Sequence, residues 1–220
     1  MVLAPRNAFS LVGCGAHRRS YHPTMLLNKS EWRIFAVNFI NLAVFGGIAM
    51  WRRNWEFLFY GSILVVVIAW ILPVHRRVRF STGVLWGLTI WGIIHLAGGN
   101  VHVGGGVLYE VQLLPVVLRY DQLVHAFGFG VATLVCHHLL RPYLIDDVRG
   151  WKAPAVILVL AGAGVGVVNE IIEFVAQWMI PETGVGGYTN TMLDLVFNMI
   201  GATIAMGWVT ARNRRSFKAV

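Results

Sequence analysis

Six long apolar stretches, separated by short polar segments, run along the chain. They cover residues 34–50, 57–74, 83–98, 122–140, 153–177 and 192–211. A helix needs about 20 apolar residues, with a range of about 17–25, to cross the core of a bilayer. The fifth stretch is the longest and contains one polar patch at 169–173, so we expect it to form one helix. The pattern therefore predicts an all-α, polytopic membrane bundle of about six transmembrane helices.

The composition agrees with a membrane protein. Hydrophobic residues make up 57% of the chain and charged residues only 13%, whereas an ordinary soluble domain has about 25% charged residues. The 220 residues leave room for one membrane domain and little else. We divide the chain into a basic N-terminal tail (1–33), a six-span membrane domain (34–211) and a basic C-terminal tail (212–220).

Lysine and arginine are distributed very unevenly between the two sides of the predicted bundle. Fifteen of the 18 fall in the two tails and in the loops after the second and fourth spans, whereas the opposite side has only Arg52, Arg53 and Arg119. Because these residues concentrate in cytoplasmic segments, the pattern predicts that both termini are cytoplasmic. The basic clusters are short and accompany no recognised nucleic-acid-binding module, so the net charge of +8 does not indicate nucleic-acid binding.

The first 30 residues contain no acidic residue and several arginines and histidines. This composition is typical of an ordinary basic cytoplasmic tail, of a transit peptide, or of a segment upstream of a true translation start at Met25. We favour the tail or the later start over a targeting segment.

Polar residues interrupt the last three apolar stretches at a similar depth in the predicted membrane. With both termini inside, the outer parts of spans four, five and six carry four acids, together with an imidazole and two amides: Asp121, Glu170, Glu173, Asp194, His125, Asn169 and Asn198. A charge at membrane depth costs about 2.5–3.5 kcal/mol on insertion scales, so chains rarely keep one without a use. Spacings of three or four residues place pairs on one helix face. We therefore expect a polar, water-accessible pocket in the outer leaflet.

Asp121 and His125 lie one helical turn apart and can form an acid–base pair in which the carboxylate orients the imidazole. The alternative is that Asp121 caps the fourth helix, where a carboxylate is favoured in any case. For Asp194 the alternative is that its carboxylate stabilises the start of the sixth helix. Asn198 lies deeper, and we expect it to bond to another helix.

Glu170 and Glu173 are three residues apart and can share a cation, as carboxylates do in other helical bundles. Together with Asp194 and His95 they are our candidate ligands for a divalent metal ion, and oxygen plus imidazole ligands suit Zn, Mn or Mg. The alternative is a structural hydrogen-bond network with Asn169 and Asn198.

Four segments carry a family resemblance: HLAGG (95–99), YDQLVHAFG (120–128), NEIIEF (169–174) and TMLDLVFNMIGA (191–202). In this order they resemble the YjdF-like family of bacterial inner-membrane proteins, and the last three are similar, more distantly, to the VanZ-like pattern. The resemblance covers about 83–211. It implies a helical membrane fold, a bacterial plasma (inner) membrane location and this polar site, and it implies no particular reaction. The family usually has Arg where this chain has Gln122, and Asp where it has Asn190.

Three functions fit these observations. The first is a membrane enzyme that acts on a lipid or lipid-linked substrate, with Asp121, His125, Glu170, Glu173 and Asp194 as its catalytic groups. The second is a proton- or cation-coupled transporter; the inner halves of the spans offer no matching polar residues to complete a path, and no inverted repeat is evident. The third is a non-catalytic envelope factor in which the polar cluster only holds the bundle together.

Overall fold

The computed structural model describes residues 28–115, 118–143, 152–181 and 183–218. Six α-helices account for most of this chain: α1 (Lys29–Trp51), α2 (Trp55–Val78), α3 (Thr82–Asn100), α4 (Tyr120–Leu140), α5 (Lys152–Met179) and α6 (Tyr188–Lys218). All six are long and apolar enough to cross a membrane. The expected all-α bundle of six spans is confirmed, and each apolar stretch lies inside one helix. The questions about residues before Met25 lie outside the described residues.

Side-chain caps define the starts of the first three helices. Asn28 and Glu31 form a reciprocal capping box at the start of α1, Asn54 accepts a hydrogen bond from the backbone of Phe57, and Ser81 accepts one from Val84. These short polar side chains satisfy backbone amides that a helix start leaves free. The polar segments between apolar stretches therefore end one helix and begin the next within a few residues.

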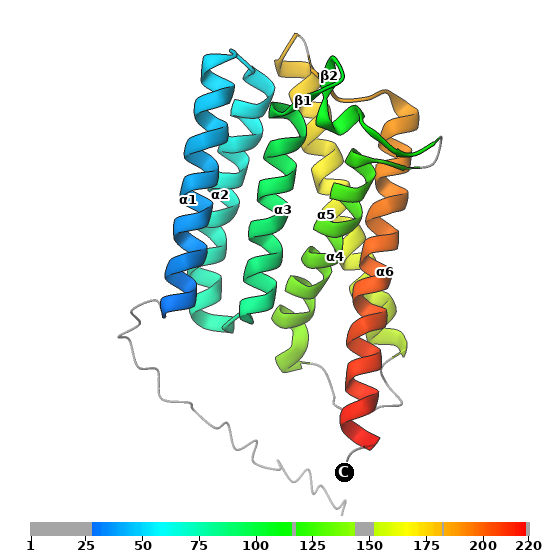
Figure 1. The fold of residues 1–220 in the computed structure, drawn as a ribbon. Coiled ribbons are helices and arrows are strands. Elements are labelled where there is room, and N and C mark those ends of the chain that lie inside the picture. Colours follow the sequence, from blue (N-terminus) through cyan, green and yellow to red (C-terminus); the bar gives the residue numbers. More distant parts are fainter. Residues whose placement is uncertain (1–27, 116–117, 144–151, 182, 219–220) are drawn as a thin grey trace, which may run out of the picture.

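The helices form two groups of three that meet along α3 and α4 (Figure 1). In the first group α1 packs against α2 and α3, and in the second α4, α5 and α6 pack against one another. In the most apolar 18-residue stretch of α4 half of the residues are buried inside the bundle, against 17% in the corresponding stretches of α1 and α2. α4 is therefore the central helix, and side chains on its buried face can reach neighbours on several helices.

The segment between α3 and α4 contains short strands that hydropathy did not predict. β1 (His102–Val103) pairs with β2 (Gly106–Val107), a 3₁₀ turn covers Leu108–Glu110, and β3 (Gln112–Leu114) pairs with β4 (Leu118–Arg119). Gly104 and Gly105 make the first turn with positive φ angles of 62° and 94°, which glycine adopts without strain. This segment lies over the end of the bundle at which α4 and α6 begin (Figure 1).

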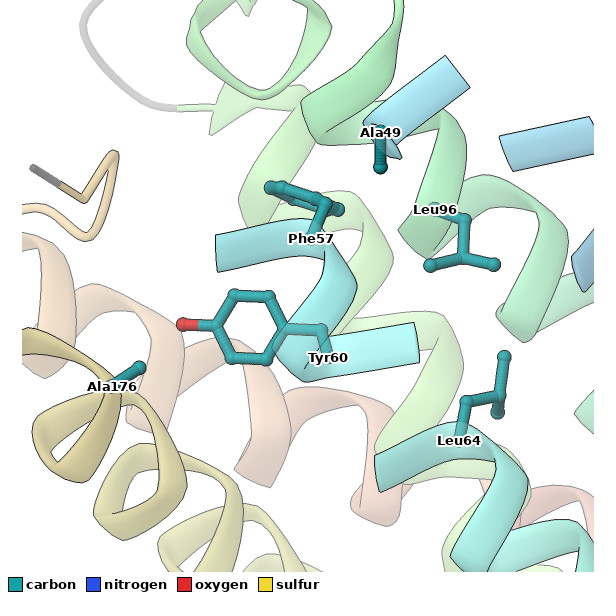
Figure 2. Packing of buried hydrophobic residues seen from close by; sticks show 6 residues of the cluster. All are labelled: Ala49, Phe57, Tyr60, Leu64, Leu96 and Ala176. Atoms are coloured by element: carbon teal, nitrogen blue, oxygen red, sulfur yellow. The ribbon is translucent and has the colours of Figure 1, made fainter. Parts of the chain in front are cut away.

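Successive helices run in opposite directions. The described chain therefore begins and finishes at the end of the bundle opposite this segment (Figure 1). An apolar cluster lies beneath the segment and joins the two groups of helices (Figure 2). It consists of Ala49, Phe57, Tyr60, Leu64, Leu96 and Ala176, from α1, α2, α3 and α5. Which end of the bundle faces the cytoplasm stays a prediction from the basic residues.

Candidate functional site

His125, on the buried face of α4, lies at the centre of the polar residues. Its Nε2 atom is 3.6 Å from Asp121 Oδ1 and 3.9 Å from Glu173 Oε1. Its Nδ1 atom is 3.1 Å from Asn198 Oδ1 and 3.5 Å from Glu170 Oε1. The imidazole is only 6% exposed. One buried ring therefore connects acidic side chains of α4 and α5 with an amide of α6.

The two ring nitrogens of His125 have different roles. Both atoms near Nδ1 are oxygens, from Asn198 and Glu170, and an amide oxygen can only accept a hydrogen bond. Nδ1 therefore carries a proton and donates it to Asn198. In a neutral ring this leaves a lone pair on Nε2, which faces Asp121 and Glu173. Asn198, the deeper residue of the α6 motif, thus bonds to another helix, as its depth predicts.

The carboxylates of Asp121 and Asp194 are joined by two amide side chains. Asn190 Nδ2 donates to Asp121 Oδ2 at 3.0 Å and to Asp194 Oδ2 at 2.7 Å. Gln122 Nε2 donates to Asp194 Oδ1 at 3.2 Å and contacts Asn190 Oδ1 at 3.4 Å. Asp194 is fully buried. The network fixes the start of α4 against the second turn of α6.

Neither aspartate caps its helix. α4 begins after Arg119, whose backbone amide donates to Gln122 Oε1 at 2.8 Å, so Gln122 supplies the capping contact. Asp121 instead accepts from Asn190. Asp194 lies beyond the first turn of α6, which begins at Tyr188. Asp121 still lies in the first turn of α4, where a carboxylate is favoured, whereas the helix-start interpretation of Asp194 is wrong because this residue lies beyond the first turn of α6.

The two glutamates of α5 have different surroundings. Glu173 Oε1 accepts a hydrogen bond from Asn169 Nδ2 at 2.7 Å. Glu170 is 9% exposed, and neither of its carboxylate oxygens has a hydrogen-bond partner in the described chain. Its Oε1 atom lies 3.5 Å from Nδ1 of His125. A buried carboxylate without donors is costly, so Glu170 is the group in this cluster that most needs a ligand.

Two overlapping triads have the spacing of metal ligands. The ligand atoms of Asp121, His125 and Asp194 all lie within 4.8 Å of one another, and those of His125, Glu170 and Glu173 do as well. His125 belongs to both triads. Carboxylate oxygens with one imidazole suit Zn or Mn, and Mg accepts the oxygen ligands.

His95, the fourth candidate metal ligand, lies apart from both triads. It stacks on Trp91, with ring centroids 5.4 Å apart, and its Nδ1 atom is 2.6 Å from the Tyr109 hydroxyl. Burial raises the pKa of Tyr109 well above its ordinary value, so the hydroxyl keeps its proton and donates it to His95. That bond occupies Nδ1, and His95 belongs to neither metal-binding group.

A cavity of about 210 Å³ lies beside the triads, under the segment between α3 and α4. Asp121 and Glu173 line it, whereas His125, Glu170 and Asp194 do not. The remaining lining residues come from the helix ends and connecting segments: Asn54, Glu56, Phe57, Tyr60, His95, Gly99, Val107, Tyr109, Glu110, Gly184, Val185, Gly186 and Asn190. The two carboxylates that flank Nε2 of His125 therefore border the cavity.

Sequence reasoning missed Glu56 in this cavity. Its Oε2 atom accepts a hydrogen bond from the backbone amide of Gly184 at 2.8 Å, which attaches the α5–α6 connection to α2. A signal was available, because Glu56 starts a helix at the same end of the bundle as Asp121. Tyr60 and Tyr109 also line the cavity and were not predicted.

Small residues close the bundle beneath the site. A Cβ on Gly166 would overlap the Asn198 side chain, one on Gly162 would overlap Thr133, and one on Gly201 would overlap the backbone of Ala126. Gly162 and Gly166 therefore allow α5 to approach its neighbours closely, as small residues do between membrane helices. α4, α5 and α6 are in close contact just below His125.

The fold and site together define a class of protein: a six-helix membrane protein with a buried cluster of carboxylates around one imidazole. The chain belongs to the predicted membrane protein family DUF2238, whose family model matches residues 32–215. This is the YjdF-like family that the four sequence segments resemble. Searches of curated proteins and of solved structures found no match.

The two departures from the YjdF-like pattern lie next to each other in the structure. Gln122 and Asn190 are in contact, and both donate hydrogen bonds to Asp194. Because amides are neutral, they orient the carboxylates of Asp121 and Asp194 without adding a positive charge. The negative charge of these carboxylates therefore stays available to a cation.

Proposed function

We propose that this protein is a membrane enzyme that carries out acid–base chemistry on a lipid or lipid-linked substrate. One observation carries the proposal: His125 Nε2 is directed at Asp121 and Glu173, 3.6 and 3.9 Å away, and both carboxylates line the cavity. In the neutral ring the Nε2 lone pair thus lies behind two carboxylates that border a space a substrate can enter. General acid–base catalysis requires this arrangement.

The geometry changes the role that the sequence suggested for Asp121. A group that orients a catalytic imidazole contacts the nitrogen away from the substrate. Asn198 and Glu170 occupy that position at Nδ1. Asp121 lies on the Nε2 side, where it can exchange a proton with a substrate or accept a hydrogen bond from it. Asn198 is therefore the positioning residue, and Asp121 and His125 are the reacting pair.

A divalent cation, or a water molecule, is held by Glu170, Glu173 and Asp194 in this proposal. The unpaired carboxylate of Glu170, and a ligand atom of Glu173 within 4.8 Å of one of Glu170, support it. A cation would balance acids that are otherwise expensive to bury. It would also act as a Lewis acid toward a substrate oxygen or lower the pKa of a bound water.

The site has the depth that a lipid-linked substrate requires. The residues around the cavity belong to the ends of α3 and α5 and to the starts of α2, α4 and α6, so the cavity lies near the level of lipid headgroups. The excess of Lys and Arg at the other end predicts that this level is the outer leaflet of a bacterial plasma membrane.

The test is turnover of lipids by the purified protein. Wild type and the variants Asp121→Asn and His125→Gln are reconstituted in nanodiscs with a bacterial lipid extract, with and without Mn²⁺, Mg²⁺ or Zn²⁺. Lipids are then followed by mass spectrometry. We expect a lipid species to be consumed by wild type and to persist with both variants. Identical lipid profiles in all samples under every metal condition would refute the enzyme proposal.

Proton- or cation-coupled transport is a second candidate, because one observation favours it. Thr133 and His137 are buried and continue the face of α4 that carries Asp121 and His125. These two residues are the polar positions in the inner half of α4 that a transport path could use. Phe129 interrupts this face between His125 and Thr133, and the close packing of Gly201 on Ala126 lies at the same level. Proton uptake by proteoliposomes that His125→Gln abolishes would favour transport over catalysis.

A further inference from the structure

The charged side chains that line the cavity next to His125 are all acidic. Four carboxyl groups line it, those of Glu56, Glu110, Asp121 and Glu173, and the described lining residues include no Lys or Arg. Several acids around one space repel one another unless a positive charge balances them. The three arginines nearby in sequence are not among the residues that line it. Arg52 contacts the carbonyl of Asn100 and the ring of His102, and Arg53 and Arg119 are exposed and outside the lining.

Aromatic rings form a second part of the same wall. Phe57 is in contact with three of them: its ring centroid lies 5.5 Å from that of Tyr60, 6.0 Å from Tyr109 and 6.1 Å from His95. The hydrogen bond from Tyr109 to His95 fixes two of these rings to each other. Aromatic faces attract organic cations, and several rings around one space are the usual way in which proteins bind quaternary ammonium groups.

One polar atom in this wall has no partner. The Tyr60 residue is only 8% exposed, and its hydroxyl is buried and has no hydrogen-bond partner in the described chain. It points across the interior toward the helix that carries Ala176 (Figure 2). Tyr60 also lines the cavity. A buried hydroxyl without a partner indicates a ligand or water in the space that it faces.

We propose that the cavity binds the positively charged amine of the substrate, a primary or quaternary ammonium group. The inference rests on the proposed function for its catalytic meaning, because it names the chemical class of molecule delivered to His125. Carboxylates supply the charge, the rings of Phe57, Tyr60 and Tyr109 supply cation–π contacts, and the Tyr60 hydroxyl supplies a hydrogen-bonding group. The level of the cavity suits the headgroup of a lipid.

The amine site and the proposed metal site are separate. His125, Glu170 and Asp194 do not line the cavity, and Glu56, Glu110 and the aromatic rings do not belong to either triad. Only Asp121 and Glu173 belong to both sites. Variants of Glu56 and Tyr109 therefore test the amine site without removing a metal ligand.

The experiment measures binding of tetramethylammonium and of ethylammonium to the detergent-solubilised full chain by isothermal titration calorimetry, with sodium chloride as the salt control. Glu56→Gln keeps an acceptor for the Gly184 amide and removes the charge. Tyr109→Leu removes the ring, and Tyr109→Phe keeps it. Glu31→Gln is the control, because it makes the same acid-to-amide change at the opposite end of the bundle, where Glu31 contacts His75.

We expect Glu56→Gln and Tyr109→Leu each to weaken ammonium binding by about tenfold, the loss of one charge or one ring contact. Tyr109→Phe should recover most of the affinity that Tyr109→Leu loses, and Glu31→Gln should bind as wild type does. No ammonium binding by folded wild type, or equal affinity in all five proteins, would overturn the inference. Folding of each variant is checked by size exclusion and thermal unfolding.

A second arm distinguishes the two sources of the amine. Wild type in phosphatidylglycerol nanodiscs is compared with wild type in nanodiscs that also contain phosphatidylcholine and phosphatidylethanolamine. Loss of tetramethylammonium binding in the mixed nanodiscs assigns the site to a lipid headgroup, and unchanged binding assigns it to a soluble amine. Ammonium binding without lipid turnover would refute the enzyme proposal alone. Turnover that the cavity variants leave unaffected, without ammonium binding, would refute the amine site alone.

Discussion

The Nδ1 atom of His125 on α4 lies 3.1 Å from the Oδ1 atom of Asn198 on α6. This contact assigns the proton of the ring, because the amide oxygen can only accept. It directs the unprotonated nitrogen toward Asp121 and Glu173 at the edge of the cavity. The packing of Asn198 against Gly166 holds the amide in place. Asn198 therefore determines which nitrogen of His125 is available for chemistry.

Replacing Asn198 by alanine should change the protonation of His125. Without the amide oxygen, only the 3.5 Å contact to Glu170 favours a proton on Nδ1, and the two tautomers should mix. Nitrogen-15 spectra of histidine-labelled protein report the tautomer directly. We expect one Nδ1-protonated signal in wild type and an averaged signal in Asn198→Ala. Asn38→Ala, which removes an amide bonded to Thr89 elsewhere in the bundle, should leave the His125 signal unchanged.

Metal analysis provides the next prediction. Purified wild type loaded with Mn²⁺ or Zn²⁺ should keep about one ion per chain, and Glu170→Ala/Glu173→Ala should lose it, because this change removes two members of a triad. Retention of the ion by a folded double variant would place the metal elsewhere or show that its binding is nonspecific.

Close packing beneath the site should make Gly201 intolerant of a side chain. A methyl group there would overlap the backbone of Ala126, and α4 and α6 would have to separate. We expect Gly201→Ala to lower the free energy of unfolding by about 1–3 kcal/mol, as overpacking does elsewhere. Gly207→Ala is a matched control on the same helix, because nothing lies within 4 Å of its added methyl group. Thermal unfolding in detergent measures both; equal stability of the two variants would contradict the packing argument.

The fold could be predicted almost completely, because hydropathy reports directly on which residues can lie in a bilayer. The helices extend beyond the apolar stretches, as at α6, which begins at Tyr188 rather than Met192. Polar residues such as Asn190 and Thr191 continue the helix, and hydropathy cannot detect this. The strands at 102–119 were missed for a related reason. Their pairing depends on backbone hydrogen bonds and on a glycine turn, and neither produces an apolar pattern.

The depth at which the site residues lie could be predicted from the sequence, but their contacts with one another could not. Alternating spans were enough to bring Asp121, Glu170 and Asp194 to one end of the bundle. The rotation of each helix about its axis, which decides contacts, was not accessible from spacing alone. His95 is at the right level, yet it bonds to Tyr109 from a segment whose path the sequence did not reveal. Glu56 looked like an ordinary acid in the first turn of a helix.

The hydrogen bond from the Gly184 amide to Glu56 should contribute to stability. Glu56→Ala leaves this partly buried amide without its acceptor, at a cost of about 1–3 kcal/mol. Glu56→Gln keeps an acceptor oxygen and should unfold at nearly the wild-type temperature. Thermal unfolding of the three proteins in one detergent tests the contact. A Gln variant as unstable as the Ala variant would mean that the charge of Glu56, rather than the hydrogen bond, stabilises the connection.

The orientation of the bundle can be tested with two exposed positions at its opposite ends. Val103 lies in β1 on the cavity side and is 48% exposed, and Tyr143 follows α4 at the other end and is 83% exposed. Single cysteines are placed at each position after Cys14 and Cys136 are replaced by alanine. Because Lys and Arg favour the cytoplasmic side, a membrane-impermeant maleimide should label Val103→Cys in intact cells. It should label Tyr143→Cys only after permeabilisation. The reverse pattern would place the cavity on the cytoplasmic side, and a substrate would then have to reach His125 from the inner leaflet.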